Sequence, residues 1–197
     1  MQAPYTTVQS VFLTLGVEVP SESSDLYIQT EQLILAMSRT IDRRANRRIY
    51  SEDDEETYLY DGDGSDLLVI SDVIDPTVTV DGVAVEVAQY PANKGYTSRI
   101  VLTDGHRFTK GRQNVAVTGL QAMNLYLPDD IQFACTALVA GVMSGILPAP
   151  SGLVVSETIG NFQTTYKVTG ELVTLDKAKR DVAQVDNIIN SYRRVAL

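Results

Sequence analysis

Hydrophobic residues recur with a helical period in three separate stretches of the chain. The first begins after Ser23 and Ser24, whose side-chain oxygens can cap a helix start, and we expect it to end near Arg48. A shorter apolar stretch from Val8 to Leu15 precedes it and stops at Gly16. The apolar positions of the long helix recur at intervals of seven, three, four and four residues: Tyr27, Ile34, Met37, Ile41 and Ala45.

The second helical stretch starts at Pro128, which suits a first turn, and the carboxylates of Asp129 and Asp130 suit the positive end of a helix. Most of its sides are apolar, so we expect it to be buried, either in the core or against a neighbouring subunit. Its apolar positions are Ile131, Ala134, Cys135, Leu138, Val139, Val142 and Ile146.

The third helical stretch follows a polar, Thr-rich segment from Val155 to Thr169, and Thr174 can cap its start. Intervals of three and four residues alternate along it, which indicates one buried face. The residues on that face are Leu175, Ala178, Val182, Val185, Ile189 and Tyr192.

Between residues 51 and 127 the helical period disappears, and β-branched runs alternate with turns rich in Gly and Asp. Two such runs flank Asp81-Gly82, which favours a tight hairpin because that turn needs positive φ. Five or six short strands at this spacing predict a small antiparallel barrel or sandwich. The expected strands are Thr57–Tyr60, Leu67–Ile70, Thr77–Val80, Val83–Val87, Arg99–Leu102 and Asn114–Thr118.

The net charge of −9 is concentrated in the same middle region of the 197-residue chain. Residues 1–50 carry five acidic and five basic side chains, residues 51–127 thirteen and five, and residues 128–197 seven and six. Because composition and charge change at the same places, we predict an α+β protein with two parts. Residues 1–50 and 128–197 form a helical frame, and residues 51–127 form an inserted β module.

The sequence contains few of the residues that enzymes commonly use for catalysis. The single histidine, His106, lies in an expected turn, where we interpret it as a tolerated polar residue. The single cysteine, Cys135, lies on an apolar helix face, where its thiol is not activated. One Cys and one His exclude a disulfide framework and the usual zinc clusters, and no phosphate-binding Gly-rich loop occurs. We therefore expect no enzymatic activity, no cofactor and no metal.

No run of about 18 apolar residues occurs, so we expect no membrane-spanning helix. The start, MQAPYTTVQS, lacks the basic and apolar segments of a secretory signal.

Two charged clusters have alternative interpretations. The segment Asp61–Asp66 could bind calcium, but it departs from the EF-hand pattern at Asp66 and Asp72, so we interpret it first as a hairpin connection. The arginines at positions 39–48 could contact phosphate, although packing over apolar surface and pairing with the acidic run Glu52–Glu56 are the preferred interpretation.

The order of these segments, with four short motifs, resembles the head-to-tail connector (adaptor) proteins of tailed bacteriophages. The first motif is Ala36-Met37-Ser38-Arg39-Thr40-Ile41-Asp42 followed by Asn46-Arg47-Arg48-Ile49-Tyr50, similar to the family's Ala-Ser-x-x-Ile-Asp and Gly-Arg-x-Phe. Asn46 and Tyr50 depart from the family's Gly and Phe, but Asn also tolerates left-handed φ and Tyr fills an aromatic pocket. The other motifs are Pro128–Ala134, Ser156–Gly160 before Thr164–Tyr166, and Asp181-Val182 with Ile188–Arg194.

The resemblance implies a non-enzymatic virion protein of the neck, made in the host cytoplasm, that assembles as a ring of twelve subunits. Its implied partners are the portal protein, identical subunits, and a tail or stopper protein, and double-stranded DNA passes through the ring without sequence-specific contact. It leaves open whether the acidic β module faces the channel, the tail or the outside.

The resemblance also points to candidate contact residues. We expect the portal or subunit interface to include Tyr192, Arg193, Arg194, Val195, Leu197, Glu157, Ile159, Phe162 and Tyr166. Arg39, Arg43 and Arg47 are candidates for phosphate contacts or salt bridges between subunits. The alternatives are another neck or tail-completion protein, or a small carbohydrate- or ligand-binding β module with helical flanks.

Overall fold

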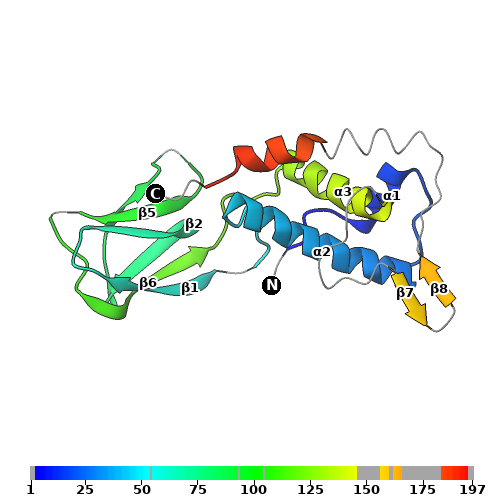
Figure 1. Cartoon of the computed structure of the whole chain (residues 1–197). Coiled ribbons are helices and arrows are strands. Elements are labelled where there is room, and N and C mark those ends of the chain that lie inside the picture. The colour runs from blue at the N-terminus through cyan, green and yellow to red at the C-terminus, as the bar shows by residue number, and fades with distance from the viewer. Residues whose placement is uncertain are drawn as a thin grey trace. The chain divides into compact units, whose positions relative to one another are not determined.

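The computed structural model describes residues 3–53, 55–92, 94–103, 105–145, 156–159, 162–165 and 183–194. Helices and a six-stranded antiparallel sheet both lie in this part of the chain, so the protein is of mixed α+β class. The chain divides into two compact units (Figure 1). A helical unit comprises Gln2–Asn46 and Leu127–Leu197, and a β unit comprises Arg47–Tyr126.

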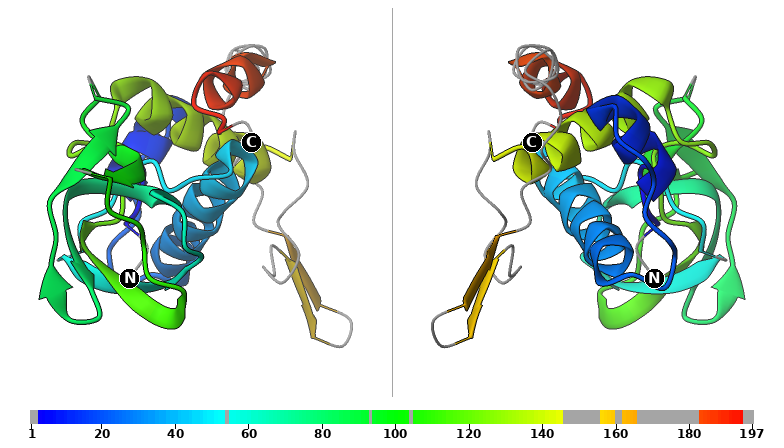
Figure 2. Two further views of the ribbon diagram at one scale, coloured as in Figure 1. Left: turned by 90° about the vertical axis from the view of Figure 1, so that its left-hand side faces the viewer. Right: turned by 90° about the vertical axis from the view of Figure 1, so that its right-hand side faces the viewer.

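The helical unit contains α1 (Val8–Leu15), α2 (Asp25–Ala45), α3 (Asp129–Met143) and a C-terminal helix at residues 183–191. Both α1 and α2 pack against α3 (Figure 2). The buried side chains of these three helices include Val11, Phe12, Ile34, Met37, Ile41, Ile131, Leu138 and Val139.

The start of α2 is confirmed at Ser24, whose hydroxyl accepts a hydrogen bond from the Tyr27 N–H at 3.2 Å. The end of α2 is not near Arg48, as expected, but at Ala45. Asn46 takes the left-handed conformation with φ 54, and its N–H donates to carbonyls of the last turn. A left-handed residue ends the helical hydrogen-bond ladder, so the basic residues that follow Asn46 are outside the helix.

Helix α3 is buried by its own chain. Ten of its residues are buried, and the elements packed against it are α1 and α2. Of the large apolar side chains on α3, Phe133 remains 38% exposed. The helix ends at Met143, and the expected apolar position Ile146 lies outside the described residues.

The β unit is built around one long strand, β2 (Leu67–Val80), where the sequence predicts two short ones. Its first half pairs with β5 (Thr97–Leu102), and its second half pairs with β6 (Gly111–Leu120). The register shifts between Ile74 and Thr77, and Asp75 has φ 48. The strand changes partners between Val73 and Ile74, and Pro76 lies in the irregularity that follows.

The complete order in the sheet is β1–β6–β2–β5–β4, with β3 (Val83–Ala84) paired to the end of β2. The first and last strands, β1 (Glu56–Gly62) and β4 (Val87–Tyr90), do not pair with each other, so the sheet is not closed. The Asp81-Gly82 hairpin is confirmed, with φ 50 and 80 at the two residues. The expected strand Val83–Val87 is instead divided between β3 and β4.

The aspartate-rich segment Asp61–Asp66 does not form a hairpin connection, because β6 lies between β1 and β2 in the sheet. Asp61 accepts a hydrogen bond from the Gln113 N–H at 2.6 Å, and Asp63 accepts one from the Ser65 N–H at 2.8 Å. The hydrophobic core of the β unit consists of Ile70, Val73, Val78, Ile100, Leu102, Phe108, Val115 and Val117.

In the Thr-rich segment, where the sequence suggests a loop, β7 (Ser156–Ile159) and β8 (Phe162–Thr165) form a two-stranded antiparallel sheet. The C-terminal helix is described from residue 183, so its expected start at Thr174 lies outside the described residues. Val185 and Ile189, two of its expected buried positions, are buried.

Candidate assembly surface

The C-terminal helix is held to the helical unit by contacts at both ends of its described part. Near its start, Asp186 forms an ion pair with Arg44 of α2 at 2.7 Å, between side chains that are both exposed. After its end, the Arg194 N–H donates to the carbonyl of Ala45 at 2.8 Å. Residues 183–194 are therefore docked on the C-terminal end of α2.

A third contact joins the C-terminal segment to the start of α3. The Tyr192 hydroxyl donates to the two carboxylate oxygens of Asp130 at 2.8 and 3.0 Å. Partial burial and this hydrogen bond to a carboxylate raise the pKa of the Tyr192 hydroxyl to about 12. Tyr192 is thus bound to the first turn of α3, whose start the sequence predicts at Pro128.

Two of the three candidate arginines on and after α2 are exposed. Arg39 and Arg43 are one helical turn apart, so they share a face of α2. Arg193 is also exposed. Among the residues that the structure describes, none forms an ion pair with Arg39, Arg43 or Arg193.

Arg47, the remaining candidate arginine, is engaged inside the β unit. Its Nε lies 2.9 Å from Asp72 Oδ2, and the two side chains are 9% and 2% exposed. The guanidinium also lies 5.0 Å from the centroid of the Tyr96 ring and 3.1 Å from the sulfur of Met123. A phosphate contact is therefore considered for Arg39 and Arg43 alone.

Asp72 enters the sequence analysis only as a departure from a calcium-loop pattern, but the structure shows that it is buried and paired with Arg47. It stands within the apolar run Leu67–Ile74, and β2 turns it toward the interior. A buried carboxylate needs a positively charged partner. The alternation of inward and outward positions in this run could therefore have predicted a cation beside Asp72.

The two ends of the β unit lie side by side. The Met123 N–H donates to the Arg48 carbonyl and the Asn124 N–H to the Ile49 carbonyl, both at 3.0 Å, and Tyr50 forms a parallel bridge with Asn124. Ile49 is fully buried. We call residues 47–50 the incoming segment and residues 122–126 the outgoing segment; together they form a short paired stem.

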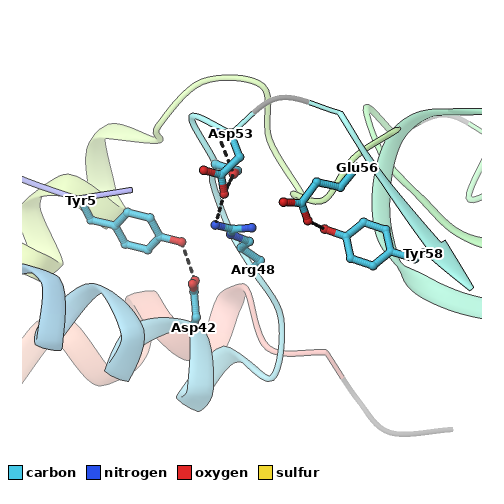
Figure 3. A network of polar contacts seen from close by, with 7 residues as sticks. Tyr5, Asp42, Arg48, Asp53, Glu56 and Tyr58 are labelled. Carbon is cyan, nitrogen blue, oxygen red and sulfur yellow. Dashed lines mark hydrogen bonds and ion pairs between the residues drawn. The ribbon is translucent and has the colours of Figure 1, made fainter. Parts of the chain in front are cut away.

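Figure 3 shows polar contacts within each of the two units. In the helical unit, the Tyr5 hydroxyl donates to Asp42 at 2.5 Å. In the β unit, Arg48 pairs with Asp53 at 2.6 Å, and the Tyr58 hydroxyl donates to Glu56 at 2.6 Å. Burial and the adjacent Glu56 raise the pKa of Tyr58 to about 12. Asp42 and Arg48, two residues of the first motif quoted above, are therefore each fixed by a contact within their own unit.

His106 lines a cavity of about 390 Å³ in the β unit. Its apolar wall is formed by Val80, Val85 and Leu102, and its polar rim includes Glu86, Thr103, His106, Arg107 and Thr109. Cys135 is far less accessible. Burial raises the pKa of its thiol to about 12, and its sulfur lies 3.7 Å from the Ser38 hydroxyl. A thiol in this state is not a nucleophile at neutral pH.

For several candidate contact residues the structure describes the backbone alone, and others lie outside the described residues. Glu157, Ile159 and Phe162 lie in the strands β7 and β8, whereas Tyr166, Val195 and Leu197 lie outside the described residues. In the described part of the chain, no three metal-ligating side chains gather in one place. Nor does any helix there have the length and apolar character needed to cross a membrane.

Comparison with known proteins identifies no family model that matches the chain and no curated protein with significant similarity.

Proposed function

We propose that this protein is a head-to-tail connector of a tailed bacteriophage, a non-enzymatic virion protein that forms a ring beneath the portal. The observation that carries the proposal is the meeting of three connector motifs in the helical unit. Asp130 of the second motif accepts a hydrogen bond from Tyr192 of the last one, and Ala45, between the two parts of the first motif, accepts one from the Arg194 N–H. Residues that carry the resemblance are far apart in sequence, yet they form one contact cluster.

In this role the helical unit is the frame of each subunit. Residues 183–194 are docked on α2 and α3, and in this proposal the portal contact is made by the residues that follow them, Val195 to Leu197. The ring would extend the DNA channel and provide the docking site for a tail or stopper protein.

In this proposal the two-stranded sheet β7–β8 contacts a neighbouring subunit of the ring. A two-stranded hairpin is marginally stable alone in water, and it gains stability from a further strand or a packed face. In a ring, a neighbouring subunit supplies that partner. Glu157, Ile159, Phe162 and Tyr166 are the residues of this segment proposed to contact it.

The finer architecture of the β unit belongs to the same proposal. We take the bent, six-stranded sheet as a small barrel- or sandwich-like module inserted in the frame. Its acidic side chains would repel DNA phosphates where they face the channel, which would keep the passing duplex from adhering.

The proposal is tested by capture on the portal protein of the same phage. Full-length protein should be retained by immobilised portal, and deletion of residues 195–197 should weaken retention at least about tenfold. The deletion leaves the Arg194–Ala45 and Tyr192–Asp130 contacts in place, so circular dichroism serves as the folding control. Negative-stain microscopy of the mixture should show a ring added to one face of the portal. Absence of capture by folded full-length protein would refute the proposal.

A ligand-binding role of the β unit is the second candidate, because the cavity beside His106 lies in the size range of small-molecule sites. Mono- and disaccharides are the probes for this role. Saturable chemical-shift changes at Val85, Leu102 and His106 in NMR spectra would support it, and unchanged spectra at millimolar sugar would dismiss it.

A further inference from the structure

Three exposed arginines lie on α2 or just after the C-terminal helix that is docked on it. Arg39 and Arg43 share one face of α2, and Arg193 precedes the residue whose N–H binds Ala45 at the end of the same helix. All three side chains are exposed and have no ion-pair partner among the described residues. We call Arg39, Arg43 and Arg193 the arginine patch.

The same chain carries the opposite charge on the β unit. Glu52, Glu55 and Glu56 are exposed, in a run that follows the incoming segment. Glu52 and Glu56 each accept a hydrogen bond from a tyrosine hydroxyl, of Tyr50 and Tyr58 respectively, and these bonds orient the two carboxylates. We call Glu52, Glu55 and Glu56 the acidic segment.

An acidic protein partner suits the arginine patch better than a nucleic acid does. The whole chain has a net charge of −9, so long-range repulsion opposes the approach of a DNA duplex. Arginine forms bidentate bonds with carboxylates as readily as with phosphates. In an assembly of identical subunits, each copy would present its own exposed carboxylates to its neighbours.

We propose that the arginine patch of one copy binds the acidic segment of the next copy. The two surfaces differ, so the contact is heterologous, and repeated contacts of this kind close into a ring when the rotation allows. This inference rests on the proposed ring function and specifies which surfaces form the subunit contact. Complementary charge would set the register of neighbouring subunits and increase their rate of association.

Two charge-reversed variants test the pairing. The first carries Arg39→Glu, Arg43→Glu and Arg193→Glu, and the second carries Glu52→Arg, Glu55→Arg and Glu56→Arg. Glu18→Arg, Glu22→Arg and Glu31→Arg, at exposed acids elsewhere in the helical unit, form a control with the same change in charge as the second variant. Self-association is measured by sedimentation velocity at high protein concentration, in about 20 mM and about 500 mM salt.

Wild-type and control proteins should self-associate in low salt, and high salt should weaken that association. Each reversed variant alone should associate about tenfold more weakly, because the attraction between the two surfaces becomes repulsion. A one-to-one mixture of the two variants should regain association, since each then presents a surface of opposite charge to the other. This recovery cannot arise from variants that fail to fold.

The proposal is overturned if wild-type protein does not self-associate, if the first variant associates as wild type does, or if the mixture fails to recover. Retention of a 30-base-pair DNA duplex by wild type, lost in the first variant and with no self-association, would assign the patch to nucleic acid instead. Portal capture separates the two proposals. Captured protein with no charge-dependent pairing refutes this inference alone, and self-association without capture refutes the connector function.

Discussion

Arg47 Nε lies 2.9 Å from Asp72 Oδ2 in the β unit, and little of either side chain is exposed to solvent. The pair joins the incoming segment to the bent strand β2. Tyr96 and Met123 pack on the same guanidinium. One arginine therefore connects four separate parts of the β unit's chain.

Removal of the cation alone should be costly. Arg47→Met leaves the Asp72 carboxylate buried without its partner, which should lower the free energy of unfolding by about 3 kcal/mol or more. The double variant Arg47→Met, Asp72→Leu removes both charges and should be more stable than the single variant. Urea denaturation of the three proteins measures this. A single variant within about 1 kcal/mol of wild type would show that the pair is not a structural requirement.

The β unit should fold without the helical unit. Its core is its own, and its two ends are joined by the stem bonds from Met123 to Arg48 and from Asn124 to Ile49. A fragment of residues 47–126 should therefore give dispersed NMR spectra and a cooperative thermal transition. A matched fragment that starts at residue 51 lacks the incoming segment and should melt at lower temperature. Equal stability of the two fragments would contradict the role of the stem.

Tyr192 should ionise later than an ordinary tyrosine. Its pKa is raised from 10.0 to about 12, so its contribution to stability is complete below pH 10 and is lost as the pH rises toward 12. Ultraviolet titration of wild type and Tyr192→Phe should differ by one phenol that ionises near pH 12. A difference centred near pH 10 would mean that the bond to Asp130 does not persist in solution.

The Cys135 thiol should report unfolding. With a pKa of about 12 and a buried sulfur, its thiolate fraction at pH 8 is about one part in ten thousand. A disulfide reagent should react slowly with native protein and rapidly in denaturant. Rapid reaction of the native protein would indicate that α3 opens often, because the thiol lies on its buried face.

Asn46 should tolerate glycine and resist alanine. Its φ of 54 is left-handed, so Asn46→Ala should destabilise the protein by about 1 kcal/mol, whereas Asn46→Gly should keep or raise its stability. Thermal unfolding followed at 222 nm measures both variants. An alanine variant as stable as the glycine variant would argue against this cap.

Local signals in the sequence predicted those elements whose cause is local. The Ser24 cap and the Asp81-Gly82 turn depend on the chemistry of one or two residues, and both are confirmed. The α+β class follows from two different hydrophobic periods, and it too is confirmed. The sequence places unit boundaries after residues 50 and 127, and contacts divide the chain after Asn46 and Tyr126.

Features that depend on pairing between distant residues were harder to predict. The sequence predicts two short strands, Leu67–Ile70 and Thr77–Val80, but β2 continues from one to the other because β5 and β6 bind its two halves. Arg47 looked like a member of a surface cluster, yet its partner Asp72 is 25 residues away. Likewise, nothing near Tyr192 in sequence indicates Asp130, because only the folded helices bring them together.

The stem also has an evolutionary consequence. A segment whose two ends are hydrogen-bonded to each other can be lengthened, shortened or exchanged without a change in the distance between the chain positions that it joins. Residues 47–126 thus form a cassette between Asn46 and Leu127. Recombination at those two positions could supply the same helical scaffold with a different β unit, and so adapt one subunit to different neighbours.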